Sequence, residues 1–386
     1  MTYLDHNATS PLRPEAKAAM MDAWDAGGNP SSVHAAGRQA RARVERAREQ
    51  MAKLVGATPD DVIFTGGGTE AIWLALSGAI AGARENDARI TRLFISAIEH
   101  DAVRANAAAL PERAAGLRVD TIPVTGDGVV DLETLRVALR EGKGRALIAV
   151  MAANNETGVI QPVEGVAQLA KDAGALLIVD AVQAAGKIEI GNLASHADYI
   201  TLSAHKLGGP QGVGALIAKE SAPFAPQVLG GGQEKRRRAG TENVAGIAGF
   251  GAAAAAAMNV ADSGARLSAL RDDFERELRH ALPDAVIFGG NAPRLPNTSN
   301  FALTGVAAET AVMALDLEGV MVSSGAACHS GKVVRSHVLE AMGVDEAIAS
   351  TVLRVSFGWT SDEADANAAI IALKKIAARA RGRAAA

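Results

Sequence analysis

Short apolar runs alternate with helical stretches through the first part of the chain, and this alternation restricts the possible folds more than any other feature. The runs cover residues 62–64, 92–95, 146–151, 175–179, 198–202 and 213–218. Strands that alternate with helices form βαβ units, in which the strands are parallel and helices cover both faces of the sheet. The sequence therefore predicts an α/β fold around a mostly parallel sheet.

Polar residues follow these strands at the points where the strands are expected to end. In chain order they are Gly68 and Thr69, His100, Asn155, Asp180 and Gln183, and then Ser203, His205 and Lys206. The carboxyl ends of parallel strands lie along one edge of a sheet, where open α/β sheets bind their ligands. We therefore expect these side chains to converge on one site.

Two of these residues indicate a cofactor. Lys206 ends one strand, directly before the turn residues 208–210, and Asp180 ends the strand before it. An amine held at a strand end can be desolvated, which lowers its pKa and lets it attack a carbonyl as the free amine. A lysine that forms an imine and a carboxylate that pairs with a pyridine nitrogen are the groups that pyridoxal phosphate requires. Taken alone, Lys206 could be a surface lysine and Asp180 a helix N-cap.

Three glycines at 66–68 lie between a strand and the helix that carries Thr69. Bare backbone N–H groups at a helix N-terminus bind phosphate, although the same glycines could form a plain flexible turn. Their spacing is neither the dinucleotide-binding G-x-G-x-x-G nor a Walker A loop. His100 could stack on a planar ring or move a proton, or have only a structural role.

The composition excludes several classes of protein. A net charge of −4 and a pI near 6.1 argue against direct nucleic-acid binding. The single cysteine, Cys328, allows neither an intramolecular disulfide nor a multi-cysteine metal site. We find no signal-peptide pattern and no apolar run long enough to cross a membrane, so a cytoplasmic, reducing location is expected.

The pattern changes near Val260, where charged amphipathic helices and short strands replace the alternation. We expect an N-terminal arm of residues 1–13 that packs with the small domain, a large cofactor-binding domain of residues 14–258, and a small α+β domain of residues 259–386. Cys328 lies in this last part, in a loop of small and polar residues. Most free cysteines are buried and inert, but this setting favours an exposed, mobile thiolate.

Seven segments resemble the motifs of the cysteine desulfurases, the NifS/IscS-like branch of the class V aminotransferases and of the fold-type I pyridoxal phosphate enzymes. They lie at residues 68–70, 99–100, 154–158, 179–183, 203–206, 238–243 and 323–328. The resemblance covers essentially the whole chain. It implies a large, mostly parallel sheet domain and a smaller α+β C-terminal domain that carries the Cys328 loop.

The resemblance also implies roles for the residues around the cofactor. Lys206 would bind the cofactor aldehyde, Asp180 would pair with the pyridine nitrogen, and Gln183 would contact the ring hydroxyl. His100 would stack on the ring and help to transfer protons. Thr69, Ser203 and His205 would hold the phosphate, and Gly68 and Asn155 would also bind the cofactor. Thr241 would reach the phosphate of a neighbouring subunit, so that a homodimer is implied.

The activity implied by the resemblance is the conversion of L-cysteine to L-alanine. Asn155 and Arg354 would bind the substrate carboxylate, and Lys206 would move the α-proton. The Cys328 thiolate would take the sulfur as a persulfide and pass it to an iron–sulfur scaffold or another acceptor protein. No intrinsic metal is expected, although Cys328 could be a transient iron–sulfur ligand shared with a scaffold.

Two alternatives stay open. One is a selenocysteine lyase, or another pyridoxal phosphate lyase or aminotransferase, that does not use Cys328. The other is a non-catalytic assembly subunit on the same fold.

Five residues depart from the family's usual pattern, and none of them replaces a group that the implied chemistry needs. Ala326 stands where serine is usual, and His329, where serine or threonine is usual, is expected to tune the thiol or the acceptor interface. Trp73 replaces asparagine and Gln211 replaces lysine. Arg236 replaces a common glycine, which is expected to make the basic loop at 235–238 stiffer and more charged.

Overall fold

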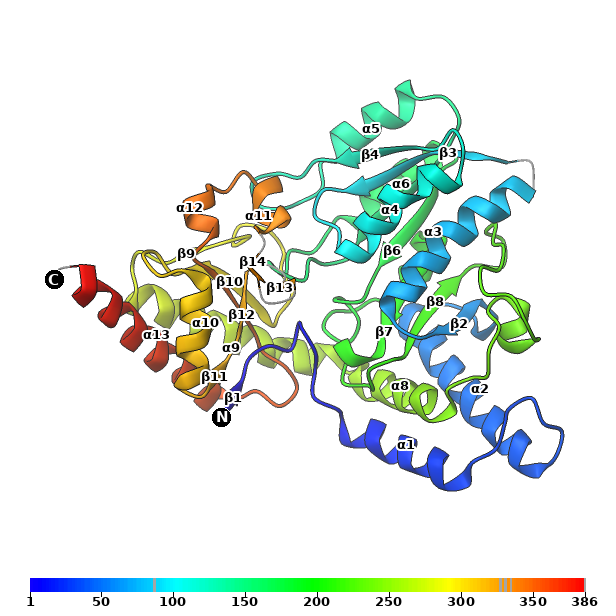
Figure 1. Cartoon of the computed structure of the whole chain (residues 1–386), viewed down its shortest axis with the longest axis horizontal. Coiled ribbons are helices and arrows are strands. Elements are labelled where there is room, and N and C mark those ends of the chain that lie inside the picture. Colours follow the sequence, from blue (N-terminus) through cyan, green and yellow to red (C-terminus); the bar gives the residue numbers. More distant parts are fainter. Residues whose placement is uncertain (86–87, 326–327, 330–331, 334, 385–386) are drawn as a thin grey trace.

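The structure is a computed structural model that describes residues 1–85, 88–325, 328–329, 332–333 and 335–384. For residues 85, 328, 329, 332, 333 and 381–384 it describes the backbone only. A large sheet with helices around it and a smaller body of helices and short strands lie next to one another, and the first residues of the chain pass between them (Figure 1).

A seven-stranded sheet with the order β2-β8-β7-β6-β5-β3-β4 forms the centre of the large body. Its strands are β2 (Val62–Thr65), β3 (Ile90–Ser96), β4 (Arg118–Ile122), β5 (Arg145–Met151), β6 (Leu176–Asp180), β7 (Tyr199–Ser203) and β8 (Gly214–Ala218). The strands from β4 to β7 pair in parallel, and only β8 runs against its neighbours β2 and β7. β2 therefore points the same way as the parallel strands. The predicted mostly parallel sheet is confirmed.

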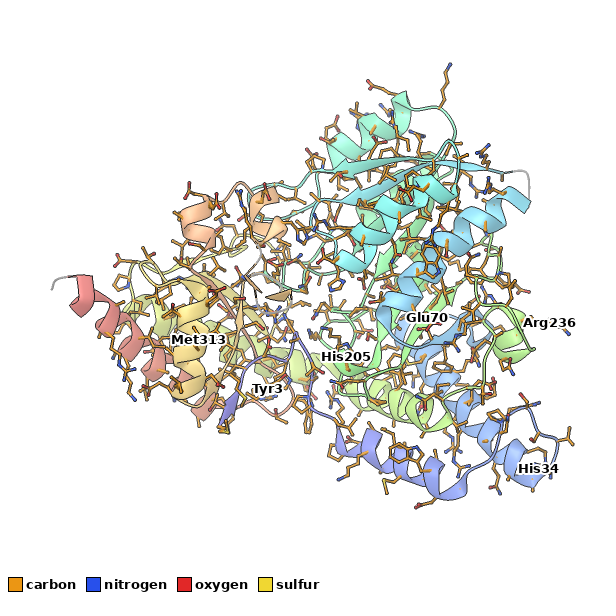
Figure 2. The ribbon with its side chains drawn as sticks, in the orientation of Figure 1. Tyr3, His34, Glu70, His205, Arg236 and Met313 are labelled. Carbon is orange, nitrogen blue, oxygen red and sulfur yellow. The ribbon has the colours of Figure 1, made fainter. Side chains whose placement is uncertain are left out.

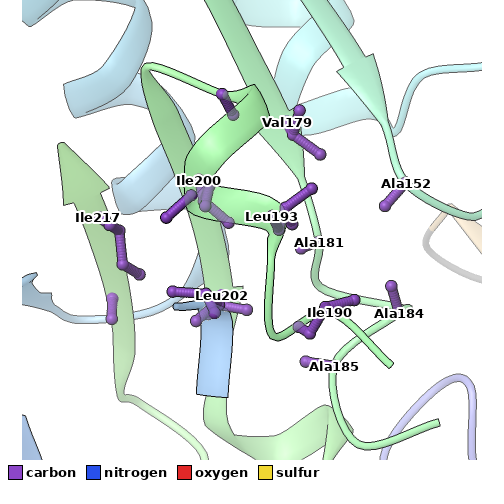
Figure 3. Packing of buried hydrophobic residues seen from close by; sticks show 14 of the residues in the cluster. Ala152, Val179, Ala181, Ala184, Ala185, Ile190, Leu193, Ile200, Leu202 and Ile217 are labelled. Carbon is purple, nitrogen blue, oxygen red and sulfur yellow. The ribbon is translucent and has the colours of Figure 1, made fainter. Parts of the chain in front are cut away.

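Helices cover both faces of this sheet. They are α1 (Pro14–Ala26), α2 (Ala35–Val55), α3 (Gly68–Glu85), α4 (Asp101–Arg113), α5 (Leu132–Glu141), α6 (Val163–Asp172), α7 (Leu193–His196) and α8 (Val244–Ala257). Successive strand residues point to opposite faces, so each strand contributes to two cores. In β7, Ile200 and Leu202 belong to the core under α2 and α8 (Figure 3), whereas Tyr199 belongs to the core under α3 and α4.

The smaller body has a four-stranded antiparallel sheet with the order β12-β15-β10-β9. Its strands are β9 (Val286–Ile287), β10 (Thr298–Ala302), β12 (Ser323–Ser324) and β15 (Val352–Ser356), and its helices are α9 (Val260–Ala281), α10 (Ala308–Leu317), α11 (His337–Ala341), α12 (Glu346–Ala349) and α13 (Glu363–Ala384). Phe274, Phe301 and Phe357 meet in its core, with ring centroids 5.8 Å apart in two pairs. A hairpin of β13 (Cys328–His329) and β14 (Lys332–Val333) leaves this sheet after β12.

α8 ends at Ala257 and α9 begins at Val260, on either side of the expected boundary between residues 258 and 259. Within the part of the chain that the structure describes, no single helix is long and apolar enough to cross a membrane. Only α8 and α9 taken together pass that test by length and composition, and they are bent by 74°.

The N-terminal arm joins the two bodies. β1 (Thr2–Tyr3) pairs in parallel with β11 (Val320–Met321), and Leu4 is part of the small-body core. The arm then crosses to the large body, where the Ser10 N–H donates to the His205 carbonyl at 2.8 Å. Residues far apart in sequence are thereby held side by side at the edge of the large sheet.

A left-handed turn interrupts the basic loop before α8. Glu234, Lys235 and Arg236 have φ values of 44°, 55° and 67°, in a region that residues with a Cβ rarely adopt. The buried Glu234 carboxylate holds this turn, because it accepts hydrogen bonds from Arg48 at 2.8 Å and from the Phe64 N–H at 3.0 Å. Arg236, which replaces a common glycine, therefore adds backbone strain as well as charge.

We expect the substitution Arg236→Gly to raise the free energy of unfolding by about 0.5–1 kcal/mol, because glycine adopts positive φ without steric cost. Arg46→Gly, at an exposed position in the interior of α2, should lower it by about 1 kcal/mol. Denaturant unfolding of both variants measures the difference. A decrease with both variants would show that the turn is unstrained.

Candidate active site

A cavity of about 410 Å³ lies at the carboxyl ends of the large-sheet strands. Its lining includes every residue that the sequence placed in the site except Thr241 and Cys328: Gly68, Thr69, His100, Asn155, Asp180, Gln183, Ser203, His205, Lys206 and Arg354. The small body contributes Ser323, Ser324 and Arg354, and the arm contributes Asn7 and Ala8. The cavity is therefore built by three separate parts of the chain.

Lys206 lies just beyond the end of β7. The strand ends at Ser203, and the 3-10 turn η2 (Ala204–Lys206) carries the lysine, so the prediction that the strand itself ends at Lys206 is wrong. Its Nζ donates to the carbonyls of Asn7 at 2.7 Å and Ala8 at 2.8 Å. Burial, and then the positive charge of Arg354, lower the pKa of Lys206 from 10.5 to about 8. About a tenth of the amine is therefore uncharged at pH 7, far more than for a lysine of ordinary pKa.

Asp180 is the last residue of β6 and is buried. Its Oδ1 accepts hydrogen bonds from the Val182 N–H at 2.9 Å and from Thr201 Oγ1 at 3.3 Å. Its Oδ2 has no hydrogen bond with the described residues and remains for a ligand in the cavity. Burial raises the pKa of Asp180, while the Val182 N–H favours the carboxylate. A protonated ring nitrogen is the kind of partner that this carboxylate suits.

The glycine loop forms the other end of the cavity. A Cβ at Gly214 would lie 2.5 Å from the Gly67 carbonyl carbon, so this close approach of two backbones requires glycine. Gly68 begins α3, whose first N–H groups have no intrahelical partner. Thr69, Ser203 and His205 line the same end, and they also line a neighbouring cavity of about 520 Å³.

The two histidines of the site are held by specific contacts. The Ala102 N–H donates to Nδ1 of His100 at 3.0 Å, which leaves the proton of the neutral ring on Nε2. Nδ1 of His205 lies 3.1 Å from Thr9 Oγ1 of the arm, and Figure 2 shows His205 where the arm meets the large body. Burial lowers the pKa of His205 to about 4, so its ring is neutral at neutral pH.

The arm contributes contacts that the sequence did not indicate. The Asn7 carbonyl accepts hydrogen bonds from Lys206 and from Gln183 Nε2, at 2.7 and 2.9 Å. Asp5 Oδ1 accepts from Arg354 Nη2 at 2.7 Å, and Arg354 Nη1 donates to the Asn155 carbonyl at 3.0 Å. The arm matches the family at residues 3–9, but a polar segment without periodicity gives no sign of which side chains it will meet.

Two predicted residues lie apart from the cavity or outside the described side chains. Thr241 is exposed in the loop before α8 and lines neither cavity. Cys328 begins β13, opposite Val333, but its side chain is outside the part that the structure describes. The chain enters this hairpin from β12, whose residues Ser323 and Ser324 form part of the cavity wall.

The family model, the related sequences and the solved structures that match this chain all point to the same family. The model "Aminotransferase class-V" matches residues 2–368. The chain is 44% identical to a cysteine desulfurase of Cereibacter sphaeroides, with 93% of this chain and 91% of that protein covered. It is 40% identical to an IscS-like cysteine desulfurase of Mycobacterium tuberculosis, with 99% and 97% covered. The solved structure of a NifS-like protein from Rickettsia africae has a TM-score of 0.87 at 35% identity, with 97% and 99% covered.

The chain belongs to the cysteine desulfurases of the class V aminotransferase family. The cofactor of this family is pyridoxal phosphate. The described residues fit that group, because three suitable groups surround one cavity. They are an amine of lowered pKa, a buried carboxylate with one oxygen that accepts no hydrogen bond from the described residues, and the N-terminus of a helix. Lys206, Asp180 and the loop at 66–69 are the residues that would hold it.

The structure accounts for part of the departures from the family pattern. Trp73 lies on α3 against the core, with the Arg113 guanidinium 5.1 Å from its ring centroid, and does not line the cavity. Gln211 lines the neighbouring cavity beside the glycine loop. Ala326 lies outside the described residues, and so does the side chain of His329.

We expect pyridoxal phosphate to label the cofactor-free protein at Lys206 with a rate that follows the free amine. Because the pKa of Lys206 is lowered to about 8, the rate should reach half its maximum near pH 8 and level off above about pH 9. Borohydride reduction and peptide mapping at each pH measure the labelling. Lys206→Met should remove the label from this peptide, and a half-maximal rate near pH 10.5 would contradict the lowered pKa.

Proposed function

We propose that this chain is a pyridoxal-phosphate-dependent cysteine desulfurase, which converts L-cysteine into L-alanine and holds the sulfur as a persulfide on Cys328. The observation that supports the proposal best is the meeting of Lys206, Asp180 and Arg354 in one cavity at the strand ends. The relatives at 40–44% identity over nearly the full length are named as cysteine desulfurases. The substrate, the residue roles and the sulfur acceptor belong to this proposal.

Arg354 is the group for the substrate carboxylate. Asp5 holds Nη2 and the Asn155 carbonyl holds Nη1, so the guanidinium has a fixed direction in the cavity wall. Asp5 Oδ2 also accepts from Ser323 Oγ at 2.9 Å, which fixes the carboxylate that orients the arginine. Each terminal nitrogen of Arg354 keeps an N–H for a planar carboxylate, the ligand that a guanidinium binds with two parallel hydrogen bonds.

Lys206 is the group for the α-proton. Pyridoxal phosphate, when bound, draws electrons from the bond that the amino acid must break. Lys206 then needs to be an uncharged amine close to that carbon, and its lowered pKa makes this form available near neutral pH. When the amine is not covalently bonded to another group, the carbonyls of Asn7 and Ala8 accept its hydrogen bonds and hold it in the cavity.

Cys328 is the group for the sulfur. Its thiolate would attack the sulfur of L-cysteine and form a sulfur–sulfur bond on the protein. The carbon–sulfur bond would break with its electron pair left on the β-carbon, which would take up a proton to become the methyl group of L-alanine. An iron–sulfur scaffold or another acceptor protein then removes the sulfur. This chemistry requires a reduced thiol, in agreement with a cytoplasmic location, and Thr241 would complete the phosphate site of a second subunit in a homodimer.

We expect Cys328→Ala to keep the cofactor absorbance but to lose sulfide and alanine release from L-cysteine by at least a hundredfold, since its only thiol is gone. Both products are measured with a reductant, beside the unsubstituted protein. Lys206→Ala, which removes the amine, should lose both products and the cofactor linkage. Undiminished turnover in Cys328→Ala would indicate a pyridoxal phosphate lyase that does not need the thiol, such as a selenocysteine lyase.

We expect Asp5→Asn to raise the KM for L-cysteine roughly tenfold, because a charge-assisted hydrogen bond that orients Arg354 is lost. The change in kcat should be smaller. Steady-state kinetics of Asp5→Asn and of Ser323→Ala, which removes only the second contact of Asp5, give the comparison. A lower KM in Asp5→Asn would show that Asp5 competes with the substrate instead of orienting the arginine.

A further inference from the structure

A second buried lysine, Lys187, lies beneath the cavity. It follows Gln183 in the turns between β6 and α7 and is only 8% exposed. It does not line the cavity, and no carboxylate among the described residues forms an ion pair with it. The proposed chemistry gives it no role, yet burying an amine is costly unless its N–H groups are satisfied.

Its contacts are with two amide side chains. Nζ of Lys187 donates to Gln183 Oε1 at 2.5 Å and to Asn7 Oδ1 at 2.7 Å. Gln183 Nε2 in turn donates to the Asn7 carbonyl at 2.9 Å, and that carbonyl also accepts from Lys206. Lys187 is thus linked to the predicted cofactor lysine through two residues that line the cavity.

These contacts fix which end of the Gln183 amide faces which neighbour. An amide can turn over with little change of shape, so its neighbours decide where the oxygen lies. Lys187 offers N–H groups, whereas the Asn7 carbonyl can only accept. In the reversed orientation the oxygen of Gln183 would face the Asn7 carbonyl, and that hydrogen bond would be lost. The N–H groups of Lys187 would also no longer have Oε1 as an acceptor.

The protonation of Lys187 agrees with this arrangement. Burial, followed by the charges of Lys206 and Arg354, lowers the pKa of Lys187 well below its usual value. An uncharged amine has two N–H bonds, and Lys187 has two acceptors, Gln183 and Asn7. The amine can therefore hold both amides without a buried positive charge.

We propose that Lys187 is a positioning residue: by donating to Gln183 Oε1 it keeps an N–H of Gln183 available to the cavity, as a hydrogen-bond donor to an oxygen of the cofactor ring. One N–H of Gln183 Nε2 is used by Asn7, and the second remains. A donor at that oxygen stabilises its deprotonated form and lowers its pKa. The inference rests on the proposed function only in taking the cavity as the pyridoxal phosphate site.

The test is the pH titration of the visible absorbance of the cofactor-loaded protein. Lys187→Met has nearly the same length but no donor, and its titration midpoint should move up by about one pH unit. Lys187→Gln keeps an N–H and should move less. Lys171→Met, at an exposed position on α6, should leave the midpoint unchanged. Asp180, His100, Lys206 and Arg354, which also face the cavity, are intact in every variant.

A double-mutant cycle separates an effect through Gln183 from a direct effect of the amine. Gln183→Leu alone should raise the midpoint as much as Lys187→Met, and the double variant should add little to either. Additive shifts, or a normal midpoint in Lys187→Met, would overturn the proposal. If Lys187→Met does not fold, Lys187→Gln in the same cycle gives the same decision, since any shift that it causes must also vanish beside Gln183→Leu.

The outcome is independent of sulfur chemistry. A protein that binds the cofactor but releases no sulfide from L-cysteine would refute the proposed function and would still allow the titration. If the protein is an active desulfurase and its absorbance titration has the same midpoint with and without Lys187, only the positioning role is refuted.

Discussion

Asn7 holds the active site together, because its polar atoms bond to both bodies of the protein at once. Its N–H donates to Ser356 Oγ, and its side chain contacts Thr298 and Asn297 in the small body, at 3.0, 2.9 and 3.1 Å. Its carbonyl accepts from Lys206 and Gln183 of the large body. A small shift of the arm would therefore move Lys206, the proposed cofactor lysine, relative to Arg354, the proposed substrate arginine.

The hydrogen bonds of Asn7 explain how so many polar groups can be buried between the two bodies. Each polar group of Asn7 has a partner, so its burial carries no penalty for an unmade hydrogen bond. The arm brings three further contacts to the same cavity, through Asp5 to Arg354, through Thr9 to His205 and through the Ala8 carbonyl to Lys206. A segment of a few residues thus sets the direction of both cations in the cavity lining, Lys206 and Arg354, and of the neutral His205.

The sequence predicts the sheet and most of the site, because both depend on local patterns. Apolar runs mark strands that are buried on both faces, and the polar residues after them fall at one edge. β4 was missed because it is an edge strand with mostly polar, partly exposed residues. The arm contacts could not be predicted either, since Asn7 and Lys206 are separated by 199 residues and only the folded chain brings them together.

The placement of Lys206 shows a feature that local sequence patterns do not predict. The apolar run predicted its strand, but the chain leaves the sheet at Ser203 and turns once before the lysine. That turn brings the amine back over the arm, to the carbonyls of Asn7 and Ala8. The choice of turn depends on the Val213 carbonyl and other tertiary contacts of Ala204, and no residue pattern in the run encodes it.

In the proposed mechanism the charge on Arg354 would link substrate binding to proton transfer. In the free site this charge is the second cause, after burial, of the lowered pKa of Lys206. A substrate carboxylate bound to Arg354 would neutralise much of that charge, so the pKa of Lys206 would rise. In the proposed mechanism a larger fraction of the amine would thus be uncharged before the substrate arrives than for an ordinary lysine, and the amine would become a stronger base afterwards, when it would accept the α-proton. Because Asp5 already offsets part of the charge and fixes the guanidinium, the size of this change depends on the arm as well as on Arg354.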